Sequence, residues 1–333
     1  EMQRSLVGSE MCIRDREKIG QLNLPSAGDI TTGQATSSNI ADKIRKGQVG
    51  GLFNIKGVTK IRDVQRIAVE ESRLKIPLLF GMDVIHGYET VFPIPLGLAA
   101  TWNMEAIEQS ARIAAIEASA DGICWTFSPM VDISQDARWG RVSEGNGEDP
   151  FLSGIMGTAF VNGLQGDDPH YLKIVSTPKH FAANNEEHNR FVCNPQISEK
   201  QLREYYFPAF EMCVKEGKAA SIMSAYNALN DVPCTLNPWL LQKVLRQDWG
   251  FQGYVVSDCG GPALLVNAHK YVKTKEAAAT LSIKAGLDLE CGDDVYDGPL
   301  LNAYKQYMVS DADIDSAACL LYTSPSPRDY AAS

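Results

Sequence analysis

Long apolar runs are absent from this chain: none approaches the roughly 20 residues that a membrane helix needs, so we expect no membrane span. A Gly-x-Gly-x-x-Gly turn after an early strand is also missing, which argues against an open dinucleotide-binding sheet. Neither a repeat of fixed period nor a Pro/Ser-rich linker divides the centre, so we expect one domain there. Positive charge is scarce, and the net charge of −10 argues against nucleic acid as a partner.

The eight cysteines form no Cys-x-x-Cys pair and no other spacing typical of metal ligands. We therefore expect no metal and no cofactor. Most of these thiols are better interpreted as small core residues.

The two ends of the chain are unusual. Residues 6–15 read LVGSEMCIRD and residues 319–329 read CLLYTSPSPRD, and one oligonucleotide can encode both on its opposite strands. Both segments resemble a translated transposase adapter from DNA library preparation. We therefore expect residues 1–16 and 319–333 to be adapter-derived, non-native ends that flank a gene fragment at residues 17–318.

Within this fragment, short apolar runs alternate with helical patterns. The apolar runs are residues 49–55, 76–85, 123–133, 173–181, 220–227, 253–258 and 285–290, with a weaker candidate at 91–99 that two prolines interrupt. The helical patterns are residues 103–122, 198–217 (with Ser198 as the N-cap), 274–286 and 311–318. Such alternation predicts an α/β protein with a parallel sheet, and seven or eight units in this length fit a single-domain (β/α)8 TIM-type barrel.

Polar residues follow most of these apolar runs. They are Asp83, Asp132, Lys179, His180, Tyr226, Asp258 and Glu290. In a parallel barrel the carboxyl ends of the strands meet at one face, so we expect these side chains to converge in a single pocket. Carboxylates mixed with cations suit a polyhydroxylated ligand, because hydroxyls both donate and accept hydrogen bonds.

Each of these residues also has a structural interpretation. Asp83 or Asp132 fits the cap of a following loop, His180 a satisfied core histidine, and Lys179 one half of a structural ion pair. The convergence of the set, more than any single member, favours a functional site.

Five longer motifs make a family resemblance specific. They are GMDVIHGYETVFPIPLGLAATWN (residues 81–103), FSPMVDISQDARWGRVSEGNGEDP (127–150), PKHFAANN (178–185), SIMSAYNALNDVP (221–233) and WGFQGYVVSDCGG (249–261). In this order they resemble the N-terminal barrel of glycoside hydrolase family 3, and among its branches the bacterial β-glucosidases. The resemblance covers essentially all of residues 17–318.

The resemblance implies a retaining, exo-acting β-glycosidase that hydrolyses terminal β-D-glucosyl residues through a covalent glycosyl-enzyme. By position, Asp258 is its nucleophile. The residues expected to bind the cleaved sugar are Asp83, Arg141, Lys179, His180, Met223 and Tyr226. The expected partner is an oligosaccharide or an aryl or alkyl β-glycoside.

Cys259 departs from the pattern of the β-glucosidases, many of which have an aromatic residue after the nucleophile. A cysteine there, together with GLDLECG (residues 286–292), resembles the β-xylosidase branch, whereas Asp83 resembles the glucosidases. A β-xylosidase or α-arabinofuranosidase therefore stays open as an alternative, as does a non-catalytic carbohydrate-binding barrel. An aldolase-type barrel with Lys179 as a Schiff base leaves the other motifs unexplained.

The general acid/base of this family usually comes from an α/β sandwich domain after the barrel, which we expect in the full-length protein. Glu144 and Glu290 satisfy only the chemistry of the role, and neither is assigned to it. His188, in FAANNEEHNRF, does not match the Asp-His motif of the family's N-acetylglucosaminidases and is expected to be a loop residue. Relatives are often periplasmic or secreted, but the segment that would carry such a signal is expected to be missing.

Overall fold

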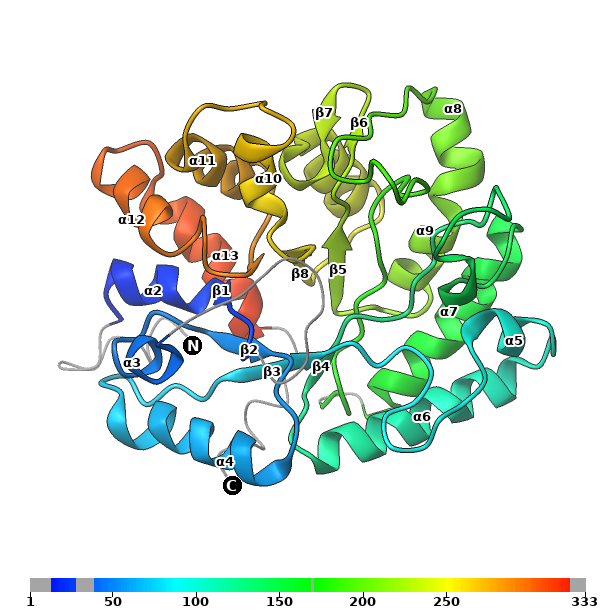
Figure 1. Ribbon diagram of the computed structural model, residues 1–333, viewed down its shortest axis with the longest axis horizontal. Coiled ribbons are helices and arrows are strands. Elements are labelled where there is room, and N and C mark those ends of the chain that lie inside the picture. The colour runs from blue at the N-terminus through cyan, green and yellow to red at the C-terminus, as the bar shows by residue number, and fades with distance from the viewer. Residues whose placement is uncertain (1–12, 28–38, 169–170, 324–333) are drawn as a thin grey trace.

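The computed structural model describes residues 13–27, 39–168 and 171–323 of the chain. Nine short strands lie within these ranges. They are β1 (Asn23–Leu24), β2 (Gly51–Phe53), β3 (Leu79–Met82), β4 (Trp125–Thr126), β5 (Ser221–Ser224), β6 (Ala228–Leu229), β7 (Val232–Pro233), β8 (Tyr254–Ser257) and β9 (Glu290–Cys291). Figure 1 shows strands such as β3, β4, β5 and β8 in the centre of the molecule, β6 and β7 at its upper edge, and most helices along its outside.

The helical segments comprise α-helices and shorter stretches of 3-10 and π-helix. The α-helices are α2 (Asp15–Gln21), α3 (Ile40–Arg45), α4 (Val58–Arg66), α5 (Pro95–Ala99), α6 (Met104–Ala120), α7 (Pro150–Gln165), α8 (Glu199–Gln201), α9 (Pro208–Lys215), α10 (Gly261–Asn267), α11 (Lys275–Ala285), α12 (Gly298–Lys305) and α13 (Asp311–Thr323). The π and 3-10 segments are η1 (Ile67–Glu71), η2 (Val142–Glu144), η3 (Leu202–Tyr206), η4 (Cys234–Leu236) and η5 (Trp239–Asp248). In the described part of the chain, no helix is long and apolar enough to cross a bilayer.

The strand pairing is parallel except in one hairpin. Strand β1 pairs with β9, β2 with β3 and then β4, and β5 with β8, whereas β6 and β7 are antiparallel. Isolated parallel bridges add Ser26 to Phe53, Trp125 to Val175, Phe181 to Ser224, and Val256 to Leu289. The chain therefore has the predicted parallel α/β organisation, although the named strands form four separate sheets rather than one closed barrel.

Five of the predicted apolar runs, 49–55, 76–85, 123–133, 220–227 and 253–258, are confirmed as holding buried strands that are shorter than the runs, whereas β9 overlaps the run 285–290 only at Glu290. Every residue of β8 (YVVS) is buried, as expected when a parallel strand is covered on both faces. Segment 173–181 joins its neighbours only through isolated bridges at Val175, Lys179 and Phe181, and Pro178 lies within it without an N–H to donate. The weak strand candidate at 91–99 is wrong, because Pro95 there begins helix α5 at a position where a helix needs no N–H donor.

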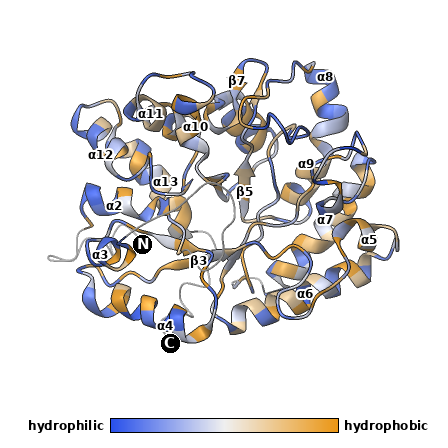
Figure 2. Cartoon of the chain, viewed as in Figure 1, coloured by the Kyte–Doolittle hydropathy of each residue, from blue (hydrophilic) through white to orange (hydrophobic). Residues whose placement is uncertain are grey.

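The predicted helices at 103–122 and 274–286 are confirmed as α6 and α11, and Ser198 caps α8 by accepting from the N–H of Gln201. Helix α6 packs against α7 and α7 against α9, with apolar residues toward the core. A Cβ on Gly163 of α7 would lie 2.3 Å from the carbonyl oxygen of Glu108, so glycine permits this close helix contact. Figure 2 shows hydrophilic residues concentrated on the peripheral helices and loops.

The predicted ends of the domain fall inside helices. Helix α2 begins at Asp15, before the expected boundary at Glu17, and α13 runs past Ala318, with Leu321 fully buried. These two helices pack against each other. The division into residues 1–16, 17–318 and 319–333 stays a prediction.

Candidate active site

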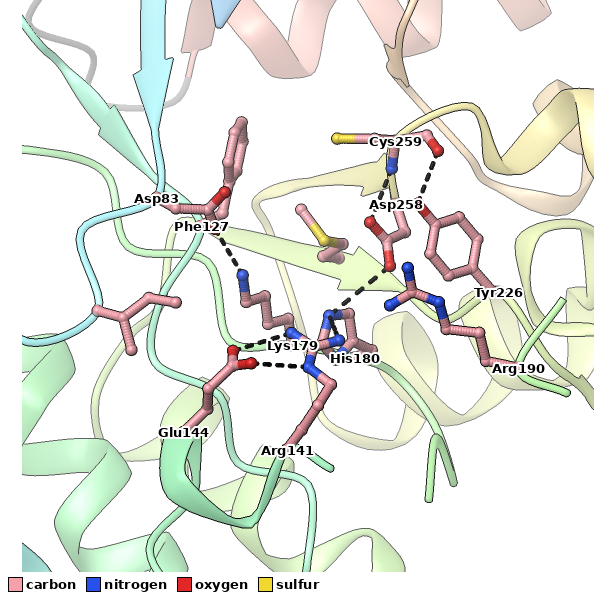
Figure 3. Close-up of a pocket in the computed structure, with 12 residues that line it drawn as sticks. Asp83, Phe127, Arg141, Glu144, Lys179, His180, Arg190, Tyr226, Asp258 and Cys259 are labelled. Carbon is pink, nitrogen blue, oxygen red and sulfur yellow. Dashed lines mark hydrogen bonds and ion pairs between the residues drawn. The ribbon is translucent and has the colours of Figure 1, made fainter. Parts of the chain in front are cut away.

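The seven residues that the family resemblance assigns to the site all line one cavity of about 260 Å³. They are Asp83, Arg141, Lys179, His180, Met223, Tyr226 and Asp258, and the lining is completed by Ile85, Phe127, Glu144, Arg190 and Cys259. Asp83 follows β3, Tyr226 follows β5 and Asp258 follows β8, so the strand ends converge as the parallel arrangement predicts. Figure 3 shows the charged side chains from these separate segments pointing toward one another.

Asp258 is held by the backbone on both sides of it. Its N–H donates to the carbonyl of Ser224 at 3.2 Å, and the N–H of Cys259 donates to its Oδ1 at 2.7 Å. Gly260 then adopts a φ of 70°, which turns the chain sharply into helix α10. One carboxylate oxygen is thereby fixed, and Oδ2 faces the cavity.

The surroundings of Asp258 act on its pKa in opposite directions. Burial raises the pKa of this carboxyl, while the charges of Arg141, Lys179 and Arg190 and the N–H of Cys259 act to lower it. Burial is the larger influence. The three cations nevertheless make the pKa of this carboxyl lower than it would be with burial alone, and so favour the ionised form.

Lys179 pairs with Asp83 across the cavity, with 2.6 Å between Nζ and Oδ1. The structural interpretation of Lys179 as half of an ion pair is therefore correct. Both residues also line the cavity, so the pair presents an ammonium and a carboxylate to any ligand. Such a pair can donate to one hydroxyl and accept from the next.

Arg141 binds Glu144 through two parallel hydrogen bonds of 2.9 Å, from Nε to Oε1 and from Nη2 to Oε2. Burial acts to raise the pKa of Glu144, but the hydrogen bonds and charge of Arg141 outweigh it and the pKa falls. Glu144 is therefore held as an anion on the guanidinium. Arg141 directly precedes η2 and Glu144 is the last residue of η2, so one short segment of the chain places both residues in the cavity wall.

His180 lies at the centre of the pocket's hydrogen bonds. Its Nδ1 is 2.7 Å from Oδ2 of Asp132, and its Nε2 is 3.2 Å from Nη1 of Arg141 and 3.6 Å from Oδ2 of Asp258. Burial first, and then the charges of Arg141 and Lys179, lower its pKa well below the usual histidine range. Asp132 itself does not line the cavity but lies behind His180.

Tyr226 supports the turn that follows Asp258 from the side. Its hydroxyl donates to the carbonyl of Cys259 at 2.7 Å, and its ring stacks edge-on against Phe191. The guanidinium of Arg190 lies over both rings, 5.0 Å from the centroid of Phe191 and 5.2 Å from that of Tyr226. The loop that carries Arg190 is thereby fastened to the pocket wall.

Sequence reasoning missed Arg190, Phe127 and Ile85 as lining residues. Arg190 comes from a polar loop without an apolar run, and only its place in FAANNEEHNRF, soon after Lys179 and His180, could have suggested it. Glu290 was expected at the site and is not among the lining residues. Its Oε2 instead accepts the N–H groups of Val295 and Tyr296, at 3.0 and 2.5 Å, and its Oε1 lies 3.2 Å from the N–H nitrogen of Val295.

Cys259 and Cys291 form a thiol pair where β8 and β9 end. Their sulfurs are 2.9 Å apart, and both cysteines are free. Burial, and then the contact with Cys259, raise the pKa of Cys291 well above the usual thiol range. Of the two, Cys259 lines the cavity and places a polarisable sulfur in its wall at the position that follows Asp258.

The protein is thus a parallel α/β protein with a polar ligand site at the ends of its strands. One carboxylate oxygen of Asp258 faces this site, and the side chains around it include cations. The chain belongs to glycoside hydrolase family 3, since residues 15–319 match the family described as "Glycosyl hydrolase family 3 N terminal domain".

Named relatives fall into two groups. A periplasmic beta-glucosidase of Salmonella typhimurium is 41% identical over 307 residues, which are 90% of this chain and 39% of that protein. An exo-1,4-beta-xylosidase of Emericella nidulans is 36% identical over 91% of this chain and 44% of its own length. A beta-glucosidase from Listeria innocua in complex with isofagomine has a TM-score of 0.86 at 33% identity, covering 96% of this chain and 45% of that one. The chain thus spans less than half the length of these relatives.

Proposed function

We propose that this chain is the nucleophile-bearing domain of a retaining, exo-acting β-glycosidase that removes terminal β-D-glucosyl residues. The observation that carries the proposal is the position of Asp258, with one oxygen fixed by the N–H of Cys259 and the other toward a cavity lined by three cations. A carboxylate so placed suits attack on an anomeric carbon, which carries positive charge in the transition state.

We also propose that the parallel strands close into a (β/α)8 barrel. The ring would run from β1 through β2, β3, β4, segment 173–181, β5, β8 and β9 back to β1. Each step is supported by a strand pair or by an isolated parallel bridge. An eight-stranded ring explains why residues from distant segments meet at one end.

The sugar-binding roles follow from the chemistry of the lining. Asp83 and Lys179 accept from and donate to neighbouring hydroxyls, and Arg141 donates to a third while Glu144 fixes its orientation. His180 adds a ring nitrogen beside Asp258, and Met223 and Tyr226 supply the apolar and hydroxyl surface near it. Together these groups would hold the ring of the cleaved sugar with its anomeric carbon toward Asp258.

In the first step, Asp258 Oδ2 forms a bond to the anomeric carbon while the glycosidic C–O bond breaks. The electron pair of that bond leaves with the aglycone oxygen, which takes a proton from an acid. Water then forms a bond to the anomeric carbon while the bond from that carbon to Oδ2 of Asp258 breaks, and the proton that the water loses returns to the acid that was deprotonated in the first step. We assign the acid to the α/β sandwich domain expected in the full-length protein, because Glu144 is bound to Arg141 and Glu290 to backbone N–H groups.

Glucose is favoured over xylose by Asp83, whose carboxylate lines the cavity and can pair an outer hydroxyl that xylose lacks. A β-xylosidase or α-arabinofuranosidase is the second candidate. It is favoured by Cys259 in the cavity wall and by the exo-1,4-beta-xylosidase among the relatives. Turnover of aryl glucoside against aryl xyloside by the full-length enzyme separates the two.

The test of the main proposal is covalent trapping. An activated 2-fluoro-β-glucoside with a dinitrophenolate leaving group needs no acid to depart, so the chain alone should become glycosylated. Mass spectrometry of peptides should place the label on Asp258. Label on another residue would refute the assignment, and sugar binding without hydrolysis by the full-length protein would instead support a binding barrel.

A further inference from the structure

Asp132 is a buried carboxylate that the proposed reaction does not use. It is 2% exposed, and its Oδ2 accepts from the backbone N–H of His180 at 3.1 Å and contacts Nδ1 of the same residue at 2.7 Å. Burying a carboxylate is costly unless it is well bound. A carboxylate placed so tightly against one histidine therefore points to a role in controlling that histidine.

The location of the proton on His180 follows from Arg141. A guanidinium has five N–H donors and no acceptor, and its Nη1 lies 3.2 Å from Nε2 of His180. Nε2 of His180 must therefore accept a hydrogen bond from Arg141 and carries no proton itself. A neutral imidazole carries one proton, so that proton lies on Nδ1 and is donated to Asp132.

Asn184 competes for the same nitrogen. Its amide nitrogen is 3.3 Å from Nδ1 and would donate, which favours the opposite tautomer. The contact with Asp132 is shorter and, with the acid ionised, charge-assisted, so it is the stronger of the two. Without the carboxylate, the amide N–H of Asn184 would favour an unprotonated Nδ1 and therefore a proton on Nε2.

We propose that Asp132 is a positioning residue that holds the His180 proton on Nδ1 and so keeps an N–H away from the attacking oxygen of Asp258. The inference rests on the proposed role of Asp258 as nucleophile. In the other tautomer, an Nε2–H would face Oδ2 of Asp258 across 3.6 Å and Nη1–H of Arg141 across 3.2 Å. A hydrogen bond to Oδ2 would stabilise the carboxylate before attack, which slows the attack, and the N–H pair facing Arg141 would repel.

The first experiment reads the tautomer directly by NMR of the ring nitrogens of the 15N-labelled chain at about pH 9, above the pKa of about 8 to which burial raises Asp132, so that this acid is ionised. The chain has five histidines, so loss of one signal set in His180→Gln assigns the relevant resonances. The expected pattern is a protonated Nδ1 and an unprotonated Nε2. A protonated Nε2, whether in the other tautomer or in an imidazolium, would overturn the proposal.

The second experiment follows Asp132→Ala, which removes the oxygen that accepts from Nδ1 and leaves the amide N–H of Asn184 as the partner of this nitrogen. We expect the NMR pattern to switch to Nε2–H and the first-order rate of trapping at Asp258 to fall about 10- to 100-fold. The apparent affinity for the fluoroglucoside should change much less, since the attack and not sugar binding is impaired. A folded Asp132→Ala chain that traps at the wild-type rate would overturn the proposal.

Asp288→Ala is the matched control. Asp288 is a buried aspartate paired with Arg246 at 2.6 Å, and it does not line the cavity. It should lose stability without losing trapping rate or altering the His180 signals. If the unsubstituted chain is not labelled at Asp258, the proposed function fails, while the NMR pattern still decides the position of the proton.

Discussion

The neighbouring strands β8 and β9 each end near a buried acid, and the two acids are used differently. Asp258, at the end of β8, has one oxygen bound by the N–H of Cys259 and the other toward the cavity. Glu290, in β9, is completely buried, and both its oxygens accept backbone N–H groups from Val295 and Tyr296. A carboxylate with a free oxygen can do chemistry, whereas one saturated by its own loop holds that loop in place.

The largest effect should come from removing the free carboxylate. Asp258→Asn keeps the shape of the side chain but removes the negative oxygen, so trapping by the fluoroglucoside should fall by about 10³-fold or more. Chemical denaturation should show a fold at least as stable as the parent, because the buried charge is gone. Trapping that survives in Asp258→Asn would mean that the two strand ends have been assigned the wrong roles.

The sequence alone could not predict that Asp258 keeps a free oxygen while Glu290 is bound by backbone N–H groups. An apolar run followed by an acid marks both Asp258 and Glu290, and it correctly indicated a buried strand in each case. The pattern does not reveal which N–H groups the following loop turns toward the acid. That depends on tertiary packing of residues 292–296, which have no periodicity.

The rest of the site shows the same limit. The residues that follow apolar runs, such as Asp83, were placed correctly because parallel strands bring their carboxyl ends together. Arg190 was missed because a loop brings it in, and Asp132 was expected in the pocket but lies behind His180. Residues 91–99 were misjudged because two prolines were weighed as interruptions of a strand rather than as the start of a helix.

The second prediction concerns the pH dependence of stability. Burial raises the pKa of Glu290 to about 7 in the folded chain, above the usual 4.5. The folded state therefore holds a proton that the unfolded state has lost, so the free energy of unfolding falls as pH rises through this window, by up to about 3 kcal/mol. Urea unfolding at a series of pH values measures the slope.

Glu290→Gln should flatten that slope, since it removes the titrating group. Part of the slope should persist, because burial also raises the pKa of Asp288 to about 6 and that of Asp132 to about 8. An unchanged slope in Glu290→Gln would show that the loop N–H groups keep this acid ionised at low pH.

The third prediction is made at about pH 5, where the protonated acid and the amide are closest in charge. Glu290→Gln should still lower the free energy of unfolding by about 1 kcal/mol. The amide oxygen can take the place of Oε2 and accept from both Val295 and Tyr296, but the amide nitrogen in the place of Oε1 cannot accept from Val295. The rate of trapping at Asp258 should stay within about threefold of the parent. A large loss of trapping with unchanged stability would give Glu290 a catalytic role after all.

The smallest effect is expected where the two strand ends touch, at Cys259 and Cys291. Their sulfurs are 2.9 Å apart, but a thiol is a weak donor and acceptor, so the contact contributes mainly packing. Cys259→Ala and Cys291→Ala should each cost about 1 kcal/mol of stability, and the double variant should differ from their sum by about 0.5 kcal/mol or less. Cys291→Ala should leave the trapping rate nearly unchanged, because the N–H that fixes Asp258 belongs to Cys259. A tenfold loss in Cys291→Ala alone would mean that β9 influences Asp258 through the sulfur contact, and that the two strand ends act as one unit.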